Sequence, residues 1–373
     1  MKKILAECNY LIHLVRCAIH NLQPREPEAG LDLQIVYEFG AYHQVANIAF
    51  YSVEKLKNKP EAELYSKWQA CRDLAIMLDI NQNYAASEIR ESLGAAGIRL
   101  LELQGTKIKQ FYPQSDWRTM SDIDFVIDQE NIPKAAEILT ELGYHDQDMY
   151  LGELNAYRPV NINIELHTEY FVETSEYREV LHSPFDSVDE NGQCKTDAFY
   201  LYNILHIAKH YFDGGCGLRR VLDMYYLNQN CGSLIDRKRT QEALEKVGLT
   251  KFAADFGELA DAWFGREEQA FPDGKMVRYV ITSGHFGTLA YGRMNRMAKV
   301  IDKNDRFAKQ KYVLRRVFPS GEILRTRYPV LERHKILYPF CWVHRGVCAL
   351  LPGSFKRIRK EVEAVKMVDT TEE

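Results

Sequence analysis

Residues 100–128 read LLELQGTKIKQFYPQSDWRTMSDIDFVID, and this stretch decides the fold. Residues 123–127 form a short apolar run that predicts a strand, and an Asp-x-Asp pattern overlaps its start. Because side chains alternate along a strand, Asp122 and Asp124 lie on one face while the apolar side chains point to the other. The stretch therefore predicts two carboxylates side by side on one face of a sheet. The alternative is an exposed strand with acidic ends.

A second strand is predicted by residues 159–167, which read PVNINIELH and alternate between apolar and polar side chains. Glu165 lies on the polar face of this strand, and His167 shares that face. Adjacent carboxylates repel each other unless a cation lies between them, and oxygen ligands suit Mg²⁺ or Mn²⁺. We therefore expect Asp122, Asp124 and Glu165 to bind a divalent metal and to act in catalysis. Glu169 is the alternative third acid.

The segment before the acids predicts a phosphate site. Residues 98–103 predict a strand, Gly105 follows, and residues 106–112 predict a short helix. Amide groups at a helix start and the helix dipole favour an anion, and the Thr106 hydroxyl can add a hydrogen bond. Three cationic side chains are near in sequence: Lys107, Lys109 and Arg118. The alternative is that Gly105 serves only as a turn residue.

The order of these elements resembles the nucleotidyltransferase superfamily related to DNA polymerase β. The sequence LQGTKIKQFYP…WRTMSDIDFVI more closely resembles an uncharacterised bacterial nucleotidyltransferase-like family. The similarity extends to HIAKHYFDGGCGLRRVLDMYYL and, more loosely, to VYEFGAYHQVANIAFYSVEKL, so it covers most of the chain. Two departures are Thr106 in place of the usual Ser, and Gln104 where closer relatives often carry Lys. The segment between Gly105 and Asp122 is also long for the superfamily.

The resemblance implies an enzyme that transfers a nucleoside monophosphate from an NTP, expected to be ATP, with release of pyrophosphate. The acceptor is open between a small molecule, a protein and an RNA end. The alternative is an inactive module that binds a nucleotide or a partner. A metal-dependent glycosyltransferase is disfavoured, because helices stand where such a fold needs a nucleotide-sugar-binding α/β half.

The resemblance also assigns residues of the two helices after residue 196 to nucleotide binding: His206, Lys209, His210, Arg219, Arg220 and Asp223. His206 and His210 are four residues apart and can face the same way, but no third ligand for zinc is evident, so we expect a polar wall. An arginine on the second helix can hold a triphosphate. The alternative for Arg219 or Arg220 is an ion pair with Asp223 at helical spacing.

The predicted fold class is α+β: a small mixed sheet, the nucleotidyltransferase core, at residues 97–195, with a helical N-terminal region at 1–96 and a larger helical C-terminal domain at 196–373. The expected helices lie at residues 5–19, 35–56, 61–78, 89–100, 133–142, 197–211, 218–228, 239–247 and 253–264. Residues 336–351 are the longest apolar run. They predict a buried helical segment, or alternatively contact with a membrane surface.

The charge of the chain is divided unevenly. Residues 275–366 hold 21 Lys and Arg against 6 Asp and Glu, although the whole chain has a formal net charge of −4. The basic part predicts an anionic partner, with a solvated basic surface as the alternative. The 8 cysteines form no CxxC pair and are expected to be reduced. No transmembrane segment is predicted, and the expected location is cytoplasmic.

Overall fold

The computed structural model describes residues 2–150, 153–160, 162–171, 175–190, 192–267, 269, 274–285, 287 and 337–342. The chain divides into two compact units. One comprises Met1–Lys209 and Cys216–His285, and the other comprises His210–Gly215 and Phe286–Glu373. The first unit contains the sheet. The expected domain boundaries after residues 96 and 195 stay predictions.

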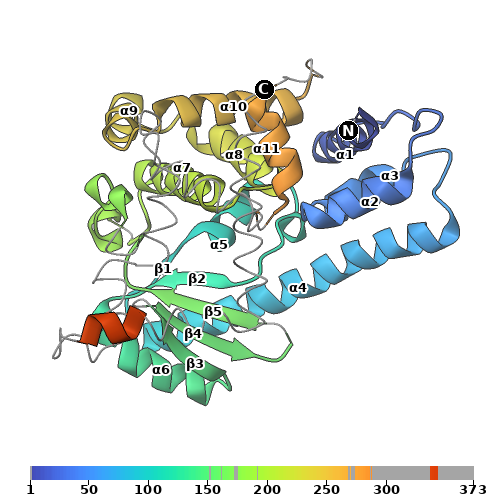
Figure 1. Ribbon diagram of the computed structural model, residues 1–373. Helices are drawn as coiled ribbons and strands as arrows, with labels where there is room; N and C mark the ends of the chain where they lie inside the picture. Colours follow the sequence, from blue (N-terminus) through green and yellow to red (C-terminus); the bar gives the residue numbers. More distant parts are fainter. Residues whose placement is uncertain are drawn as a thin grey trace. The chain divides into compact units, whose positions relative to one another are not determined.

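The sheet has five strands in the order β1-β2-β5-β4-β3 (Figure 1). The strands are β1 (Leu101–Glu102), β2 (Ile123–Val126), β3 (His145–Tyr150), β4 (Glu153–Arg158) and β5 (Ile162–His167). The central pair, β2 and β5, is parallel, whereas every other neighbouring pair is antiparallel. This mixed sheet among helices confirms the α+β fold class.

One face of the sheet is apolar and covered by two helices, α4 (Ala62–Ala95) and α6 (Ile132–Glu141). The alternation of β2 and β5 turns Ile123, Phe125 and Ile164 toward these helices, and all three side chains are fully buried. The alternate positions, including the predicted acids, therefore lie on the opposite face. The apolar core fixes which way the acids point, since a shift of one residue would bury them.

The remaining helices are α1 (Lys2–Ile19), α2 (Leu33–Tyr42), α3 (Ala46–Val53), α5 (Gln104–Ile108), α7 (Thr196–Asp213), α8 (Leu218–Cys231), α9 (Arg237–Lys246), α10 (Thr250–Phe264) and α11 (Lys275–Ser283). Figure 1 shows α7 and α8 on the side of the sheet opposite α4 and α6. The N-terminal helices join this layer, because α1 contacts α10 and the His20 ring bonds to the Phe264 carbonyl oxygen at 2.7 Å.

Three helix predictions in the N-terminal part are wrong. The expected helix at 35–56 is two helices, α2 and α3, which separate where Gln44 takes a positive φ of 55°. The expected helices at 61–78 and 89–100 are one continuous helix, α4. The middle of α4 is polar, so its sequence has no apolar pattern that predicts a buried helix. Asp79 and Gln82 are nevertheless buried there, because both make polar contacts with a loop that is distant in sequence. Local sequence does not contain that information.

The hairpin of β3 and β4 was not predicted. Its residues are mostly polar, and in β4 only Leu154 and Ala156 are buried. β1 is also shorter than the predicted strand at 98–103. By contrast, β2, β5, α6 and the four predicted helices after residue 196 are confirmed within one to three residues at most ends.

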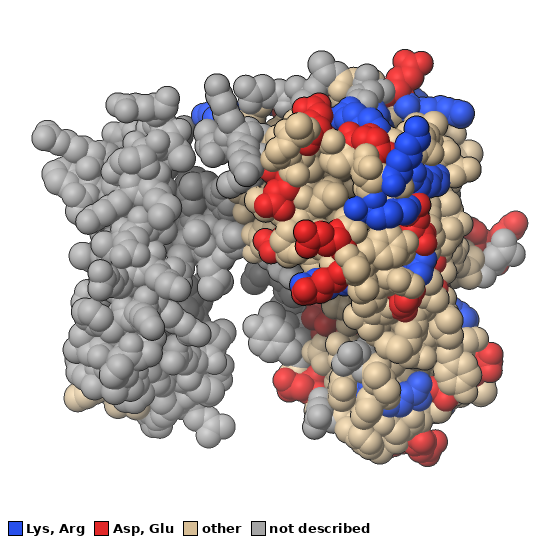
Figure 2. Space-filling model, turned by 90° about the vertical axis from the view of Figure 1, so that its right-hand side faces the viewer, with Lys and Arg blue, Asp and Glu red and all other residues tan. Residues whose placement is uncertain are grey.

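Two expectations fall largely outside the described residues. The apolar run at 336–351 is described only at 337–342, where residues 338–342 are helical and Phe340 is 70% exposed. Most of the basic stretch after residue 275 is likewise outside. Figure 2, seen from the side of α1–α4, shows both signs of charge among uncharged residues on the described part of that face.

The seven cysteines in the described part form no disulfide, and all but Cys71 are buried. Among the helices that the structure describes, none is both long and apolar enough to cross a membrane.

Candidate functional site

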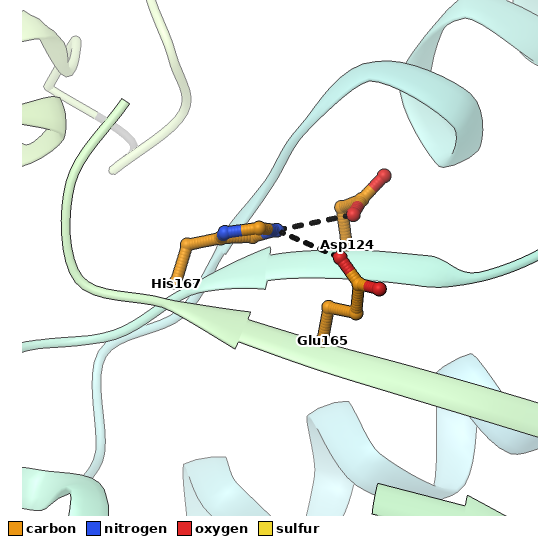
Figure 3. A group of neighbouring side chains, drawn as sticks. All are labelled: Asp124, Glu165 and His167. Atoms are coloured by element: carbon orange, nitrogen blue, oxygen red, sulfur yellow. Dashed lines mark hydrogen bonds and ion pairs between the residues drawn. The ribbon is translucent and has the colours of Figure 1, made fainter. Parts of the chain in front are cut away.

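Two predicted acids meet on the open face of the central strand pair. Asp124 of β2 and Glu165 of β5 are direct neighbours in the parallel register. Asp122 directly precedes β2. Figure 3 shows Asp124, Glu165 and His167 turned toward one another above these strands. Each of the three offers one ligand atom, and these atoms all lie within 4.8 Å of one another.

His167 lies among carboxylates. Its Nε2 is 3.1 Å from Asp124 Oδ1 and 3.7 Å from Glu165 Oε2, and its Nδ1 is 3.1 Å from Glu153 Oε1. Burial opposes a charge on the ring, but the hydrogen bonds to Asp124 and Glu153 prevail and raise the pKa of His167 to about 10. In the absence of a metal, the imidazolium neutralises part of the acidic group.

The carboxylates still repel one another. Burial, followed by the charges of Asp122 and Asp124, raises the pKa of Glu165 to about 7. Burial and Asp124 also raise the pKa of Asp122, although three arginines oppose this shift. A divalent cation would relieve the repulsion, and the two carboxylates and one imidazole fit Mg²⁺ or Mn²⁺ as a donor set.

A buried cationic group lies beside the acids, formed by Arg118, Arg219 and Arg220, which are 3%, 3% and 9% exposed. Arg118 bonds to both oxygens of Asp223, each at 3.0 Å, and the Tyr112 hydroxyl donates to the same carboxylate at 2.7 Å. Asp223 therefore pairs with a residue 105 positions away. The ion pair with Arg219 or Arg220, which was the alternative interpretation of these residues, is not among the described contacts.

The two arginines of α8 differ in their partners. Arg219 donates to the Thr119 carbonyl oxygen at 2.5 Å, lies 2.6 Å from His285 Nε2 and also contacts Gln44. The side chain of Arg220 makes no hydrogen bond or ion pair with any residue that the structure describes, and its Nε is buried without a partner. Burial, followed by the charge of Arg118, lowers the pKa of Arg220. Arg220 is therefore the cation of this group whose side chain has no hydrogen-bonded or ion-paired acid among the described residues, although Asp223 and Asp122 favour its charge without direct contact.

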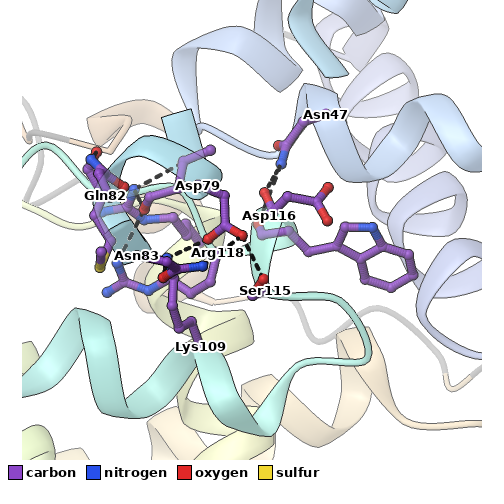
Figure 4. Close-up of polar contacts among 12 residues, drawn as sticks. Asn47, Asp79, Gln82, Asn83, Lys109, Ser115, Asp116 and Arg118 are labelled. Atoms are coloured by element: carbon purple, nitrogen blue, oxygen red, sulfur yellow. Dashed lines mark hydrogen bonds and ion pairs between the residues drawn. The ribbon is translucent and has the colours of Figure 1, made fainter. Parts of the chain in front are cut away.

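The long segment between Gly105 and Asp122 is held against α3 and α4 by polar contacts (Figure 4). Asp79 accepts hydrogen bonds from Lys109 and from Ser115, the latter at 2.5 Å. Gln82 donates to the Met120 carbonyl oxygen at 3.0 Å, and Asn47 donates to that of Asp116 at 3.0 Å. These contacts position Arg118 and the start of β2. Lys109 is thus part of the support of the site rather than of its open face.

The predicted phosphate turn is buried. The Thr106 hydroxyl donates to the Leu103 carbonyl oxygen at 2.9 Å. A Cβ on Gly105 would lie 2.4 Å from the Met120 sulfur, so any larger residue here would require the Met120 side chain to shift. Lys107 donates to the Cys194 carbonyl oxygen at 3.0 Å and lies over the Phe199 ring. The phosphate-binding role of this turn stays a prediction.

The predicted residues of α7 lie toward its C-terminal half. His206 contacts the Tyr202 ring edge-on, with centroids 5.8 Å apart. Lys209 is exposed, and its charge lowers the pKa of Glu153 after the larger effect of the His167 hydrogen bond. His210 also lies on α7. The structure does not test the binding roles of these three residues.

Three residues of this region were absent from the predicted site. His167 shares the polar face of its strand, and that alternation could have identified it. Glu153 lies in the unpredicted hairpin. Tyr202 is 4% exposed on α7, and burial, followed by the charge of Asp124, raises its pKa well above the ordinary value. No sequence signal distinguished Tyr202 from a core residue.

Comparison with protein families agrees with this geometry. A family model described as "uncharacterised nucleotidyltransferase" matches residues 30–265, which include the whole sheet, both groups of charged residues and helices α2 to α10. No curated protein and no solved structure matches the chain. Because the family model spans more than half of the chain, this protein belongs to the uncharacterised nucleotidyltransferase family.

Proposed function

We propose that the protein transfers a nucleoside monophosphate from an NTP, expected to be ATP, to an acceptor with release of pyrophosphate. One observation carries the proposal: Asp124 and Glu165 are paired in register on parallel strands, beside the buried side chain of Arg220, which forms no ion pair with any described acid. An acidic group that needs a cation, next to a cationic group that needs an anion, is complementary to a metal-bound triphosphate.

The acidic side chains have distinct roles in this proposal. Asp122, Asp124 and Glu165 would hold Mg²⁺ or Mn²⁺, which when bound supplies positive charge to the phosphates and to the acceptor oxygen. That oxygen forms a bond to the α-phosphorus while the bond to the pyrophosphate oxygen breaks. Glu165, with a pKa of about 7, is suited to receive the acceptor proton near neutral pH.

The cationic side chains would bind the phosphates. Arg220 is the first candidate because it lies buried near Asp122 with no described partner. Arg118 and Arg219 add to the positive potential while their own contacts hold α8 and the loop in place. Lys209 lies exposed near Glu153 and can meet the outer phosphates. Gly105, Thr106, Lys107, His206 and His210 keep their predicted nucleotide-binding roles as part of the proposal.

The test measures binding of the four NTPs and release of pyrophosphate, with and without Mg²⁺ or Mn²⁺. Asp124→Asn removes one charge of the site, and Asp148→Asn on the exposed part of β3 is the matched control. We expect metal-dependent binding and turnover in wild type and in the control, and loss of both in Asp124→Asn.

The alternative, an inactive module on the same fold, makes a different prediction in the same assay. Metal-dependent NTP binding with no pyrophosphate release across a range of acceptors (small hydroxyl compounds, the protein itself, RNA ends) would favour it. No NTP binding by folded wild-type protein would overturn the catalytic proposal and leave only an inactive module that binds a partner. A partner for the basic residues after 275 stays a separate prediction, tested by binding to RNA and to anionic vesicles.

A further inference from the structure

A metal site built from carboxylates alone is the usual expectation for an Asp-x-Asp strand with a third acid. The donor group in this chain differs, because the atoms that converge come from Asp124, Glu165 and His167. We propose that His167 is itself a metal ligand, and that its nitrogen makes the site favour Mn²⁺ over Mg²⁺. This inference rests on the proposed metal-dependent function and concerns the same site.

The distances around His167 Nε2 are close to those between ligands that share an ion. Neighbouring ligands of an octahedral ion at about 2.1 Å lie about 3 Å apart. His167 Nε2 is 3.1 Å from Asp124 Oδ1 and 3.7 Å from Glu165 Oε2. Small side-chain movements would therefore bring all three atoms to bonding distance from one ion, with no change in the strands.

Glu153 orients the imidazole for this role. Its Oε1 is 3.1 Å from His167 Nδ1, on the opposite side of the ring from the acidic group. A carboxylate that accepts the hydrogen bond of one ring nitrogen leaves the other nitrogen directed at the metal, which is a recurrent arrangement of metal-binding histidines. Glu153 comes from β4, next to β5 in the sheet, so the backbone ladder fixes its place.

The competing role for His167 is a counter-ion that withdraws when a metal binds. Withdrawal would break the contact with Glu153, and the His167 side chain is only 16% exposed. Coordination needs no such movement, so the geometry favours a ligand.

The nitrogen donor sets the expected metal preference. Mg²⁺ prefers oxygen ligands and water, whereas imidazole suits first-row transition ions. Mn²⁺ also accepts carboxylate and phosphate oxygens in octahedral geometry, so it meets the requirements of all three donors and of a bound triphosphate. The chemical class that the site selects is therefore a divalent transition ion of oxygen–nitrogen preference, with Mn²⁺ as the probe.

The experiment is pulsed electron paramagnetic resonance of Mn²⁺ bound to the full chain, which detects nitrogen nuclei coordinated to the ion. Protein labelled with ¹⁵N-histidine assigns any coupling to imidazole. The variants are His167→Gln and Glu153→Gln, and His182→Gln at an exposed loop position is the matched control. Mn²⁺ and Mg²⁺ affinities are measured in parallel, and thermal melts check that each variant is folded.

We expect nitrogen coupling in wild type and in the control, and none in His167→Gln. Glu153→Gln should weaken Mn²⁺ binding by about tenfold to a hundredfold, as the loss of a hydrogen-bond partner of a ligand does elsewhere. Mg²⁺ binding should change less than Mn²⁺ binding in His167→Gln.

Bound Mn²⁺ without histidine coupling in wild type would overturn the inference, whether or not any variant folds. NTP turnover in that same sample would leave the proposed function standing. Histidine coupling without NTP turnover at any acceptor would keep His167 as a ligand and remove the proposed activity. No Mn²⁺ binding at all would overturn the inference. The proposed function would then be tested separately, by whether NTP turnover depends on Mg²⁺.

Discussion

The two charged halves of the site satisfy their charges in opposite ways. The acidic half, on β2 and β5, has one imidazole for several carboxylates, and Glu165 has a pKa raised to about 7. The cationic half, around α8, has three buried arginines and uses Asp223 to neutralise Arg118. The acidic half is partly open, whereas the cationic half is almost fully buried.

This difference distinguishes residues that stabilise the fold from residues that we propose bind the ligand. A charge that is paired inside the protein stabilises the fold, and its removal leaves a buried partner uncompensated. A charge without a partner costs stability and is retained where a ligand supplies the counter-charge. On this criterion we expect Arg118 and Asp223 to act mainly in the framework, and Arg220 and the carboxylates to bind the ligand.

The largest expected effect comes from the acidic half. Glu165→Gln should lower turnover about a hundredfold to ten-thousandfold, because it removes both a proton acceptor and a metal ligand. Pyrophosphate release under saturating metal is the measurement. Glu169→Gln is the control, since Glu169 pairs with Arg178 at 3.4 Å outside the acidic group. If Glu169→Gln caused the loss instead, Glu169 would be the third acid.

The next effect tests the framework role of the cationic half. Arg118→Gln should reduce the free energy of unfolding by about 3–5 kcal/mol, because Asp223 is left buried without its partner. Urea denaturation measures it. Combined with Asp223→Asn, the double variant should be less destabilised than the sum of the two single changes. Additive losses would contradict direct coupling.

Arg220→Gln should separate binding from stability. The nucleotide should bind about tenfold to a hundredfold more weakly, as expected for a lost charged hydrogen bond. Stability should stay constant or rise, because no described residue pairs with Arg220. NTP titration and urea denaturation of the same sample measure both, with Arg237→Gln on α9 as the control. Lost stability with unchanged binding would place Arg220 in the framework.

The smallest expected effect is the change of metal affinity with pH. A metal must displace the proton of Glu165 below pH about 7 and that of His167 below about 10. Affinity therefore rises with pH, by about tenfold per unit for each proton released, and more steeply below pH 7 than above it. Mn²⁺ titrations at pH 6, 7 and 8 measure the slope. An affinity that falls with rising pH would contradict both assignments.

The sequence alone determined the parts of the site whose signals are local. The alternation in residues 123–127 and 159–167 predicted β2 and β5 and the face of their acids, because only one register buries the isoleucines. The structure places Asp124 and Glu165 as neighbours on paired strands, and their chemical roles stay predictions. The helices after residue 196 were predictable for the same reason, since their apolar periodicity is strong.

Contacts between distant segments decided the rest, and no local pattern encodes them. The pairing of Asp223 with Arg118 rather than with a helical neighbour depends on the loop that Asp79 and Gln82 hold in place. The position of Glu153 behind His167 depends on a hairpin with too few apolar residues to be predicted. Hydrophobic periodicity reports only whether a side chain is buried. The pairing of charges depends on the packed tertiary structure, because each buried polar group then needs a hydrogen-bond partner.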